Sequence, residues 1–214
     1  LAPMQDVTGL PFMSLVAERG PPDLFFTEFF RVHANSRLSP AILSSITENP
    51  TNRPVFAQII GENVADINRT ISDLKEYPVA GIDLNMGCPA PRVYKKNVGG
   101  GLLKDPSKIQ QILQSMRSMI DGNLTVKMRI GFEDDQNFEE ILKIISGSGV
   151  NLLSIHVRTV KGGYNSPPQY EYVDKALQLL GDDCPILVNG SIESASDACL
   201  LKDKLGVMGV MIGR

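Results

Sequence analysis

Short apolar segments alternate with amphipathic segments along the whole chain, and this alternation constrains the fold most. The apolar segments are short and continuous, which is typical of parallel strands buried on both faces. The amphipathic segments place apolar residues near a period of 3.6 and predict helices. The expected strands are Leu1–Met4, Leu24–Glu28, Val55–Ile60, Gly81–Asn85, Thr125–Arg129, Leu152–Val157, Ile186–Asn189 and Val207–Gly213. The expected helices are Leu10–Arg19, Pro40–Thr47, Val64–Glu76, Ser107–Ile120, Phe138–Ser146, Tyr172–Leu180 and Ala195–Leu205.

This order of elements over 214 residues favours an α/β fold, the (β/α)8 TIM barrel with parallel strands, lacking its last helix. A doubly wound sheet is the alternative, but no G-x-G-x-x-G follows the first expected strand. The chain opens on "LAPM" without an initiating Met and stops at "VMIGR", directly after an apolar segment. We therefore expect residues 1–214 to be one barrel domain cut at both ends from a longer protein.

Composition excludes several classes of protein. The formal net charge of −3 argues against a wholly basic protein that coats nucleic acid. Cys88, Cys184 and Cys199 form no C-x-x-C pair, and His33 and His156 lack metal-type spacing. No apolar segment approaches the roughly 20 residues of a membrane span. We expect a cytoplasmic, monomeric protein with no metal and no membrane contact.

Almost every expected strand ends on a polar or reactive residue. In a closed parallel barrel these carboxyl-terminal ends converge on one mouth, where barrel enzymes place their active sites. A ring that holds Lys, Arg, His, Gln and Asn together therefore predicts a functional site. The residues are Met4 with Gln5, Glu28, Gln58, Asn85, Lys127 with Arg129, His156 with Arg158, Asn189, and Arg214.

The segment "TVKMRIG" brings cations to this ring. Period-two alternation turns Thr125, Lys127 and Arg129 to one side of their strand, which we expect to be the barrel interior. A buried lysine without a partner is costly, so Lys127 implies an anionic ligand. The alternative is a structural salt bridge to Glu28 or Asp83.

Two further strand ends carry candidate binding groups. His156 in "SIHVRT" is expected close to Lys127 and Asn85 on neighbouring strands, although a lone His on a strand is often a core residue. "VNGSI" (188–192) and "MIGR" (211–214) end the seventh and eighth strands. Backbone N–H groups beside glycines, with an Arg nearby, make a phosphate-binding site at this place in the barrel.

The loop "GCPAPRVYKKNVGGG" holds the most unusual residue, Cys88. Free cysteines are usually small buried hydrophobes, but this one sits in a proline-rich turn rather than on an apolar face. A thiol with an ordinary pKa near ~8.5 is mostly protonated at neutral pH and can donate a proton. It could instead be a nucleophile if Arg92, Lys95 or Lys96 stabilised the thiolate. The residues leave acid and nucleophile open.

The same loop carries a basic cluster with an aromatic residue, Arg92, Tyr94, Lys95 and Lys96. Such a cluster is usually a solvated loop, but beside a reactive centre it could hold a phosphodiester backbone. Gly99–Gly101 would allow the loop to open and close as a lid.

Taken together, "LAPM", "QIIG", "DLNMGCPAPRV" with "GGGLLKDP", "TVKMRIG", "IHVRT", "VNGSI" and "VMIGR" resemble the tRNA-dihydrouridine synthases. The resemblance covers essentially all 214 residues, and "N-x-GCP-x-x-x-V" is its most specific element. "FFTEFFRV" (25–32) is most similar to the bacterial C-type branch, which acts on the uridine at position 16 of the tRNA D-loop.

This resemblance implies an FMN-binding barrel reduced by NADPH, followed by a helical tRNA-binding domain. It implies flavin-ring contacts from Pro3, Met4, Gln5, Gln58, Lys127 and His156, and phosphate contacts from Asn189, Gly190, Ser191, Gly213 and Arg214. Substrate contacts are implied for Asn85, Arg92, Arg158 and Tyr164. Cys88 would be the proton donor, protonating C5 of uracil while reduced flavin delivers hydride to C6. Cysteine in a stiff loop then makes sense, because the acid must stay at one point above the ring.

Two other functions remain open at this stage. Another FMN barrel, such as a dihydroorotate dehydrogenase, shares the Lys, Asn and phosphate elements but not "N-x-GCP-x-x-x-V" followed by the triple glycine. A non-catalytic RNA-binding remnant would not need the full set of site residues. We therefore expect an NADPH-driven, flavin-dependent reductase of tRNA uridine.

Overall fold

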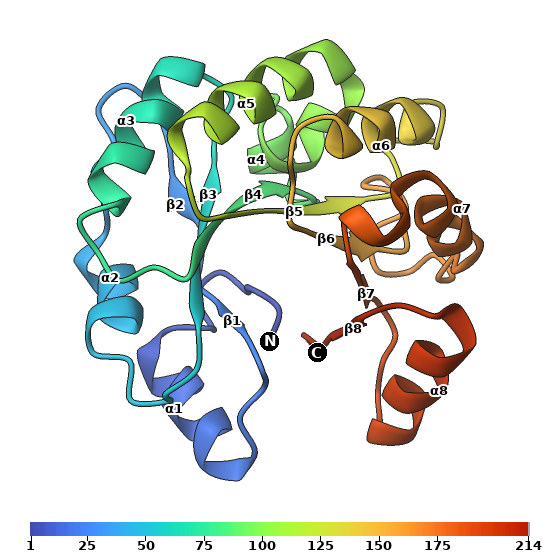
Figure 1. The fold of residues 1–214 in the computed structure, drawn as a ribbon, viewed down its shortest axis with the longest axis horizontal. Helices are drawn as coiled ribbons and strands as arrows, with labels where there is room; N and C mark the ends of the chain where they lie inside the picture. Colours follow the sequence, from blue (N-terminus) through green and yellow to red (C-terminus); the bar gives the residue numbers. More distant parts are fainter. Residues whose placement is uncertain (214) are drawn as a thin grey trace.

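The structure is a computed structural model that describes residues 1–213. Parallel strands alternate with helices and curl into a partial barrel, with the helices on the outside (Figure 1). This confirms the expected (β/α)8 class. The strands are β1 (Phe25–Phe26), β2 (Phe30–Arg31), β3 (Val55–Ile60), β4 (Gly81–Met86), β5 (Asn123–Arg129), β6 (Leu152–His156), β7 (Ile186–Asn189) and β8 (Gly209–Met211). The helices are α1 (Leu10–Arg19), α2 (Pro40–Thr47), α3 (Val64–Leu74), α4 (Pro91–Tyr94), α5 (Pro106–Met119), α6 (Phe138–Ser146), α7 (Glu171–Leu180) and α8 (Ala195–Leu205), with 3-10 turns η1 (Gly99–Lys104) and η2 (Gly181–Asp183).

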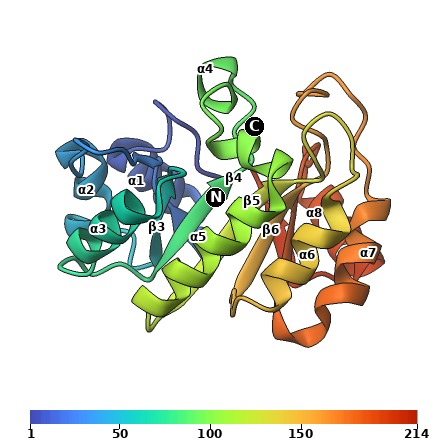
Figure 2. The same cartoon turned by 90° about the horizontal axis from the view of Figure 1, so that it is seen from above.

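The sheet runs in the order β1-β3-β4-β5-β6-β7-β8, and β2 also pairs with β3. All of these pairings are parallel. Helices α3, α5 and α6 lie side by side along the outer face of the sheet (Figures 1 and 2). Because every strand points the same way, the loops that follow the strands gather at one mouth.

Local sequence signals explain where the helices begin and end. The Asp105 side chain accepts a hydrogen bond from the Lys108 N–H, and Pro106 follows as the first residue of α5. Ser194 caps α8 in the same way, and Gly206 ends that helix in the left-handed conformation. The α5 side chains that face the sheet are fully buried, which anchors the helix to the barrel. They are Ile109, Ile112, Leu113 and Met116.

The expected first strand, Leu1–Met4, is wrong, because these residues form no regular strand. The segment lies beside the two edge strands of the sheet, β1 and β8 (Figure 1). It makes single hydrogen bonds, from the Leu1 N-terminus to the Leu24 carbonyl (3.0 Å) and from the Ala2 N–H to the Ile212 carbonyl (2.8 Å). Pro3 has no N–H, so a ladder of hydrogen bonds cannot continue through it.

The expected second strand, Leu24–Glu28, is shorter and interrupted. It forms β1, and a separate β2 pairs further along β3. Between the two, the Thr27 hydroxyl accepts a hydrogen bond from the Gln58 N–H at 3.1 Å and donates to the Glu28 carbonyl at 2.7 Å. A side chain therefore replaces the backbone ladder at this point. The last strand, expected over Val207–Gly213, is limited to β8.

The loop after β4 contains two elements that the sequence did not predict, α4 and η1. Gly99, Gly100 and Gly101 lie inside η1 and are buried. A Cβ at Gly100 would lie 2.5 Å from Val160 Cγ2, and one at Gly101 would lie 2.6 Å from the Tyr94 carbonyl oxygen. In this structure these glycines allow two loops to pack against each other without side chains. Their expected part in a lid stays a prediction.

Among residues 1–213, no helix is long and apolar enough to cross a membrane. Within the same residues, no group of three or more His, Cys, Asp or Glu side chains could hold a metal ion.

Candidate active site

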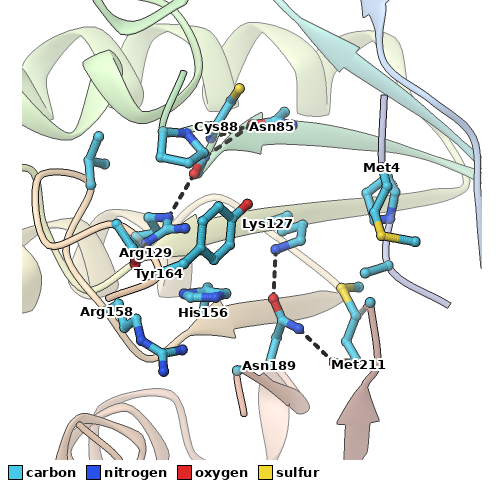
Figure 3. A pocket seen from close by; sticks show the side chains of 18 of the residues that line it. Met4, Asn85, Cys88, Lys127, Arg129, His156, Arg158, Tyr164, Asn189 and Met211 are labelled. Atoms are coloured by element: carbon cyan, nitrogen blue, oxygen red, sulfur yellow. Dashed lines mark hydrogen bonds between the residues drawn. The ribbon is translucent and has the colours of Figure 1, made fainter. Parts of the chain in front are cut away.

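A cavity of about 940 Å³ opens at the carboxyl ends of the strands. This volume is within the roughly 300–1,000 Å³ of small-molecule and cofactor sites. Side chains from the ends of β4, β5, β6, β7 and β8 face it (Figure 3). The structure brings most of the expected site residues to this one cavity. Those that line it are Pro3, Met4, Gln5, Asn85, Cys88, Lys127, His156, Arg158, Tyr164, Asn189, Gly190, Ser191 and Gly213.

Two expected residues that the structure describes do not line the cavity, and a third lies outside the described residues. Gln58 is fully buried one layer below it, and Arg92 is exposed on α4. Arg214 lies outside the described residues. In this arrangement Gln58 does not line the cavity, and both ends of its amide are hydrogen-bonded to other side chains. Its predicted contact with a flavin ring is therefore not formed by the present geometry. Gln58 Nε2 donates to Asp83 Oδ2 at 2.7 Å, and its Oε1 accepts from Asn85 Nδ2 at 2.8 Å.

Lys127 crosses the cavity from β5 toward β7. Its Nζ donates to Asn189 Oδ1 at 3.1 Å, and Asn189 Nδ2 donates to the Met211 carbonyl on β8 at 2.7 Å (Figure 3). Burial, and next the charge of Arg129, lower the pKa of Lys127 to about 8, while the carboxylate of Asp83 opposes that shift. Within residues 1–213 the ion pairs do not include Lys127, so the alternative of a structural salt bridge to Glu28 or Asp83 is not realised. This ammonium group is available to an anion or an electron-rich ring.

The backbone around Cys88 is held from both sides. Asn85 Oδ1 accepts hydrogen bonds from the N–H groups of Gly87 (3.1 Å) and Cys88 (3.0 Å). On the other side, Arg129 Nε donates to the Gly87 carbonyl at 3.0 Å. The Cys88 thiol is half-buried and packs on the small apolar cluster of Phe29, Ile60 and Val93. Its sulfur points away from Lys127 in this arrangement (Figure 3).

Arg129 is a site residue whose bridging role the sequence did not reveal. It is almost fully buried and donates from NH1 to the carbonyls of Thr159 (2.9 Å) and Gly163 (3.1 Å). Its guanidinium lies 5.3 Å from the ring centroid of Tyr164. The Tyr164 ring in turn meets His156 edge-on, with centroids 6.0 Å apart. Arg129 thereby joins the Cys88 loop to the loop that carries Tyr164, and only its alternation with Lys127 hinted at this position.

The loop after β7 has the geometry of an anion site. Gly190 and Ser191 both have positive φ, of 126° and 52°. Arg158 is buried beside them and donates from NH2 to Ser191 Oγ at 2.7 Å. Tyr170, which the sequence did not single out, donates its hydroxyl to the Gly190 carbonyl at 2.8 Å. A Cβ at Gly190 would lie 3.2 Å from Arg158 NH1, so only glycine leaves room beside this cation. Backbone N–H groups next to a buried guanidinium suit a phosphate.

A profile described as dihydrouridine synthase (Dus) matches residues 1–214. The chain belongs to the dihydrouridine synthase family. A "Probable tRNA-dihydrouridine synthase" of Staphylococcus aureus (strain COL) is 34% identical over 223 residues. A "Probable tRNA-dihydrouridine synthase 2" of Bacillus subtilis (strain 168) is 31% identical, also over 223 residues. Both alignments cover 100% of this chain, which spans 66% and 67% of the length of these two relatives.

Two solved structures share the fold at low sequence identity. The phospho-2-dehydro-3-deoxyheptonate aldolase of Thermotoga maritima is similar with a TM-score of 0.54 at 14% identity, covering 95% of this chain and 54% of that enzyme. The "Putative Copper Homeostasis Protein CutC" of Streptococcus agalactiae gives a TM-score of 0.55 at 11% identity, covering 87% of this chain and 95% of that protein. Both similarities concern the barrel architecture alone.

Proposed function

We propose that the full-length protein is a tRNA-dihydrouridine synthase, an FMN-dependent oxidoreductase driven by NADPH. In this proposal it reduces the C5=C6 bond of a uridine in the tRNA D-loop, and the similarity to the C-type branch points to position 16. One observation carries the proposal within the family: Cys88, Lys127 and the Gly190–Ser191 loop line the same cavity. A proton source, a cation and an anion site at one barrel mouth match the parts that this reaction needs.

The residues present fit a flavin mononucleotide. The Gly190–Ser191 loop and Arg158 would hold the phosphate, because the space beside Arg158 NH1 is kept open by a glycine. Lys127 and Asn189 would face the ring from one side, and Met4 and Met211 offer apolar contacts (Figure 3). Bound flavin would supply the hydride. The positive charge of Lys127 would stabilise electron density on the reduced ring.

Cys88 would hold the proton that C5 of uracil receives. General acid catalysis of this kind contributes about 10²- to 10⁴-fold. In the structure the thiol packs against Phe29, Ile60 and Val93, so proton delivery requires it to turn from this cluster toward the cavity. Asn85 holds the backbone of the loop meanwhile, through its bonds to Gly87 and Cys88. Asn85 would therefore act mainly on the position of the acid, in addition to its predicted contact with uracil.

Cations and rings around the mouth would receive the RNA. Tyr94 and Phe132 meet edge to face with centroids 5.3 Å apart, and Lys104 and Lys161 lie over these rings. The predicted cluster of Arg92, Lys95 and Lys96 is exposed on and after α4, beside this surface. Such mixed basic and aromatic surfaces bind phosphates and unstacked bases. Tyr164, 55% exposed, stands at the rim where a target base would enter.

The test is Cys88→Ala in the full-length protein, given tRNA from cells that lack the gene. We expect dihydrouridine, measured by mass spectrometry, to fall by at least about 100-fold while FMN stays bound. Cys199→Ala, at an exposed position on α8, is the matched control and should keep full activity. Full activity of Cys88→Ala would remove the proton-donor role. Turnover of a free pyrimidine without RNA would favour a dihydroorotate dehydrogenase-like enzyme instead, and a protein that binds RNA without flavin would indicate the non-catalytic alternative.

A further inference from the structure

An ionisable side chain lies inside the barrel below the cavity, where barrels usually hold branched apolar residues. Asp83 on β4 is fully buried and is aligned with Gln58 on β3 and Thr125 on β5. Thr125 Oγ1 donates to Asp83 Oδ1 at 2.6 Å, and Gln58 Nε2 donates to Asp83 Oδ2 at 2.7 Å. A carboxylate costs free energy in this place, so its presence calls for a purpose beyond packing.

The carboxylate begins a chain of hydrogen bonds that leads to the cavity. Asp83 accepts from Gln58, whose Oε1 accepts from Asn85 Nδ2 at 2.8 Å. Asn85 Oδ1 then accepts from the N–H groups of Gly87 and Cys88. The three side chains of this chain are at most 7% exposed, so water does not compete for the bonds between them. The last bonds, to Gly87 and Cys88, are part-buried.

The two ends of this chain fix its direction. An ionised carboxylate only accepts hydrogen bonds, and a backbone N–H only donates them. Between these ends, Gln58 and Asn85 each have one carbonyl and one NH2 group. Only one orientation of each amide satisfies every donor and acceptor. If Gln58 turned by 180°, its carbonyl would face Asp83, and its NH2 group would face that of Asn85.

We propose that Asp83 is a positioning residue, which acts through Gln58 and Asn85 to hold the backbone of Gly87 and Cys88 at the cavity. The hydrogen bonds support this placement on their own, and its catalytic meaning rests on the proposed role of Cys88 as proton donor. Asp83 touches neither the cavity nor Cys88. It sets the polarity of the two amides, and the second amide holds the loop.

The test compares three variants in the full-length protein by amide hydrogen exchange at Gly87 and Cys88. Asp83→Leu keeps the branched shape and removes the acceptor; we expect exchange at both amides to rise at least about 10-fold, with exchange in β6 unchanged. Thr125→Val removes the other hydrogen bond to the same carboxylate and is the matched control; exchange should stay within about twofold. Asp83→Asn should also stay close to wild type, because its carbonyl can accept from Gln58 while its NH2 group donates to the Thr125 hydroxyl.

Gln58→Met interrupts the chain at its middle link and gives the answer if Asp83→Leu fails to fold; it should raise exchange at the same two amides. Unchanged exchange at Gly87 and Cys88 in the folded variants would overturn the proposal, and so would equal effects of Asp83→Leu and Thr125→Val. Formation of dihydrouridine is measured in parallel, and we expect Asp83→Leu to lower it by about 10-fold or more. A wild-type protein that makes no dihydrouridine, yet shows the exchange pattern, would refute the proposed function and leave the positioning role intact.

Discussion

The loop after β4 and the loop after β7 approach the same cavity but are held in different ways. The Cys88 loop is fixed from below, by hydrogen bonds that Asn85 passes on from the barrel interior. The Gly190 loop is fixed from its flank, by Arg158 and the Tyr170 hydroxyl, and owes its shape to two consecutive positive φ angles. The first loop is thus held by side chains beneath it, whereas the second is held by side chains at its flank and takes its shape from two positive φ angles.

This difference suits the two tasks proposed for the loops. An acid such as Cys88 must be set at one point relative to a ring, and a buried, directional chain of hydrogen bonds restricts it strongly. A phosphate is bound by several N–H groups at once, so the backbone itself must be shaped. Changes in the first loop should therefore affect turnover, and changes in the second should affect cofactor retention.

The largest effect should come from Gly190→Ala. Its φ of 126° is unfavourable for an L-residue, and the new Cβ would lie 3.2 Å from Arg158 NH1. We expect FMN affinity, measured by fluorescence titration, to fall by about 100-fold. Gly206→Ala is the matched control, because Gly206 also has a positive φ, of 67°, but its Cβ would meet nothing within 4 Å. It should cost about 1–3 kcal/mol of stability without weakening FMN. Equal FMN affinity in the two variants would contradict the role given to this loop.

Gly100→Ala should have a somewhat smaller effect, and on turnover rather than on FMN affinity. The new methyl group would lie 2.5 Å from Val160 Cγ2 and 2.9 Å from the Cys88 carbonyl oxygen, so the Cys88 loop must shift. We expect dihydrouridine formation to fall by about 10- to 30-fold with FMN affinity unchanged. Gly122→Ala, at an exposed position with nothing within 4 Å, should leave both unchanged. Loss of FMN in Gly100→Ala would mean that the two loops are not independent.

Features that depend on neighbouring residues could be predicted from the sequence, whereas those that depend on distant partners could not. The helices α1, α2, α6 and α8 have the predicted bounds, because capping residues, prolines or glycines mark their ends. The alternation along the strand correctly predicted that Lys127 faces the cavity. These predictions depend on residues that are close together in the chain.

Where the sequence failed, the decisive partner is distant in the chain. The sequence does not show that Gly100 is needed for close packing, because its partner Val160 lies 60 residues away in the chain. Gln58 lies on the expected strand, but nothing local shows that Asp83 and Asn85 engage both ends of its amide. Tyr170 carried no local signal for its bond to Gly190.

The buried carboxylate of Asp83, where the chain of hydrogen bonds below the Cys88 loop begins, also predicts a dependence of stability on pH. Burial raises the pKa of Asp83 to about 6, against the opposing effects of its bonds to Thr125 and Gln58 and of the charge of Lys127. Between pH of about 4 and 6 the folded protein therefore binds a proton that the unfolded chain does not, so this group contributes stability at low pH that is lost as the pH rises through 6. The free energy of unfolding of Asp83→Asn, measured by urea unfolding, should therefore rise relative to that of wild type by about 1 kcal/mol or more as the pH goes from 4 to 7. Asp182→Asn, at an exposed position, is the control, and its free energy of unfolding should follow that of wild type across this pH range. If Asp83→Asn also followed wild type, burial would not destabilise the ionised carboxylate.

The smallest effect should come from Tyr170→Phe, which tests how much this side chain contributes to the conformation of the Gly190 loop. This change removes one hydrogen bond, from the Tyr170 hydroxyl to the Gly190 carbonyl, and keeps the ring. A single bond of this kind is worth about 1 kcal/mol, so FMN affinity should fall by about fivefold or less. Tyr77→Phe, at a position after α3 that does not line the cavity, is the control. Because Arg158 still holds Ser191, turnover at saturating FMN should match wild type. A loss of turnover larger than the loss of affinity would show that this loop also sets the position of the ring.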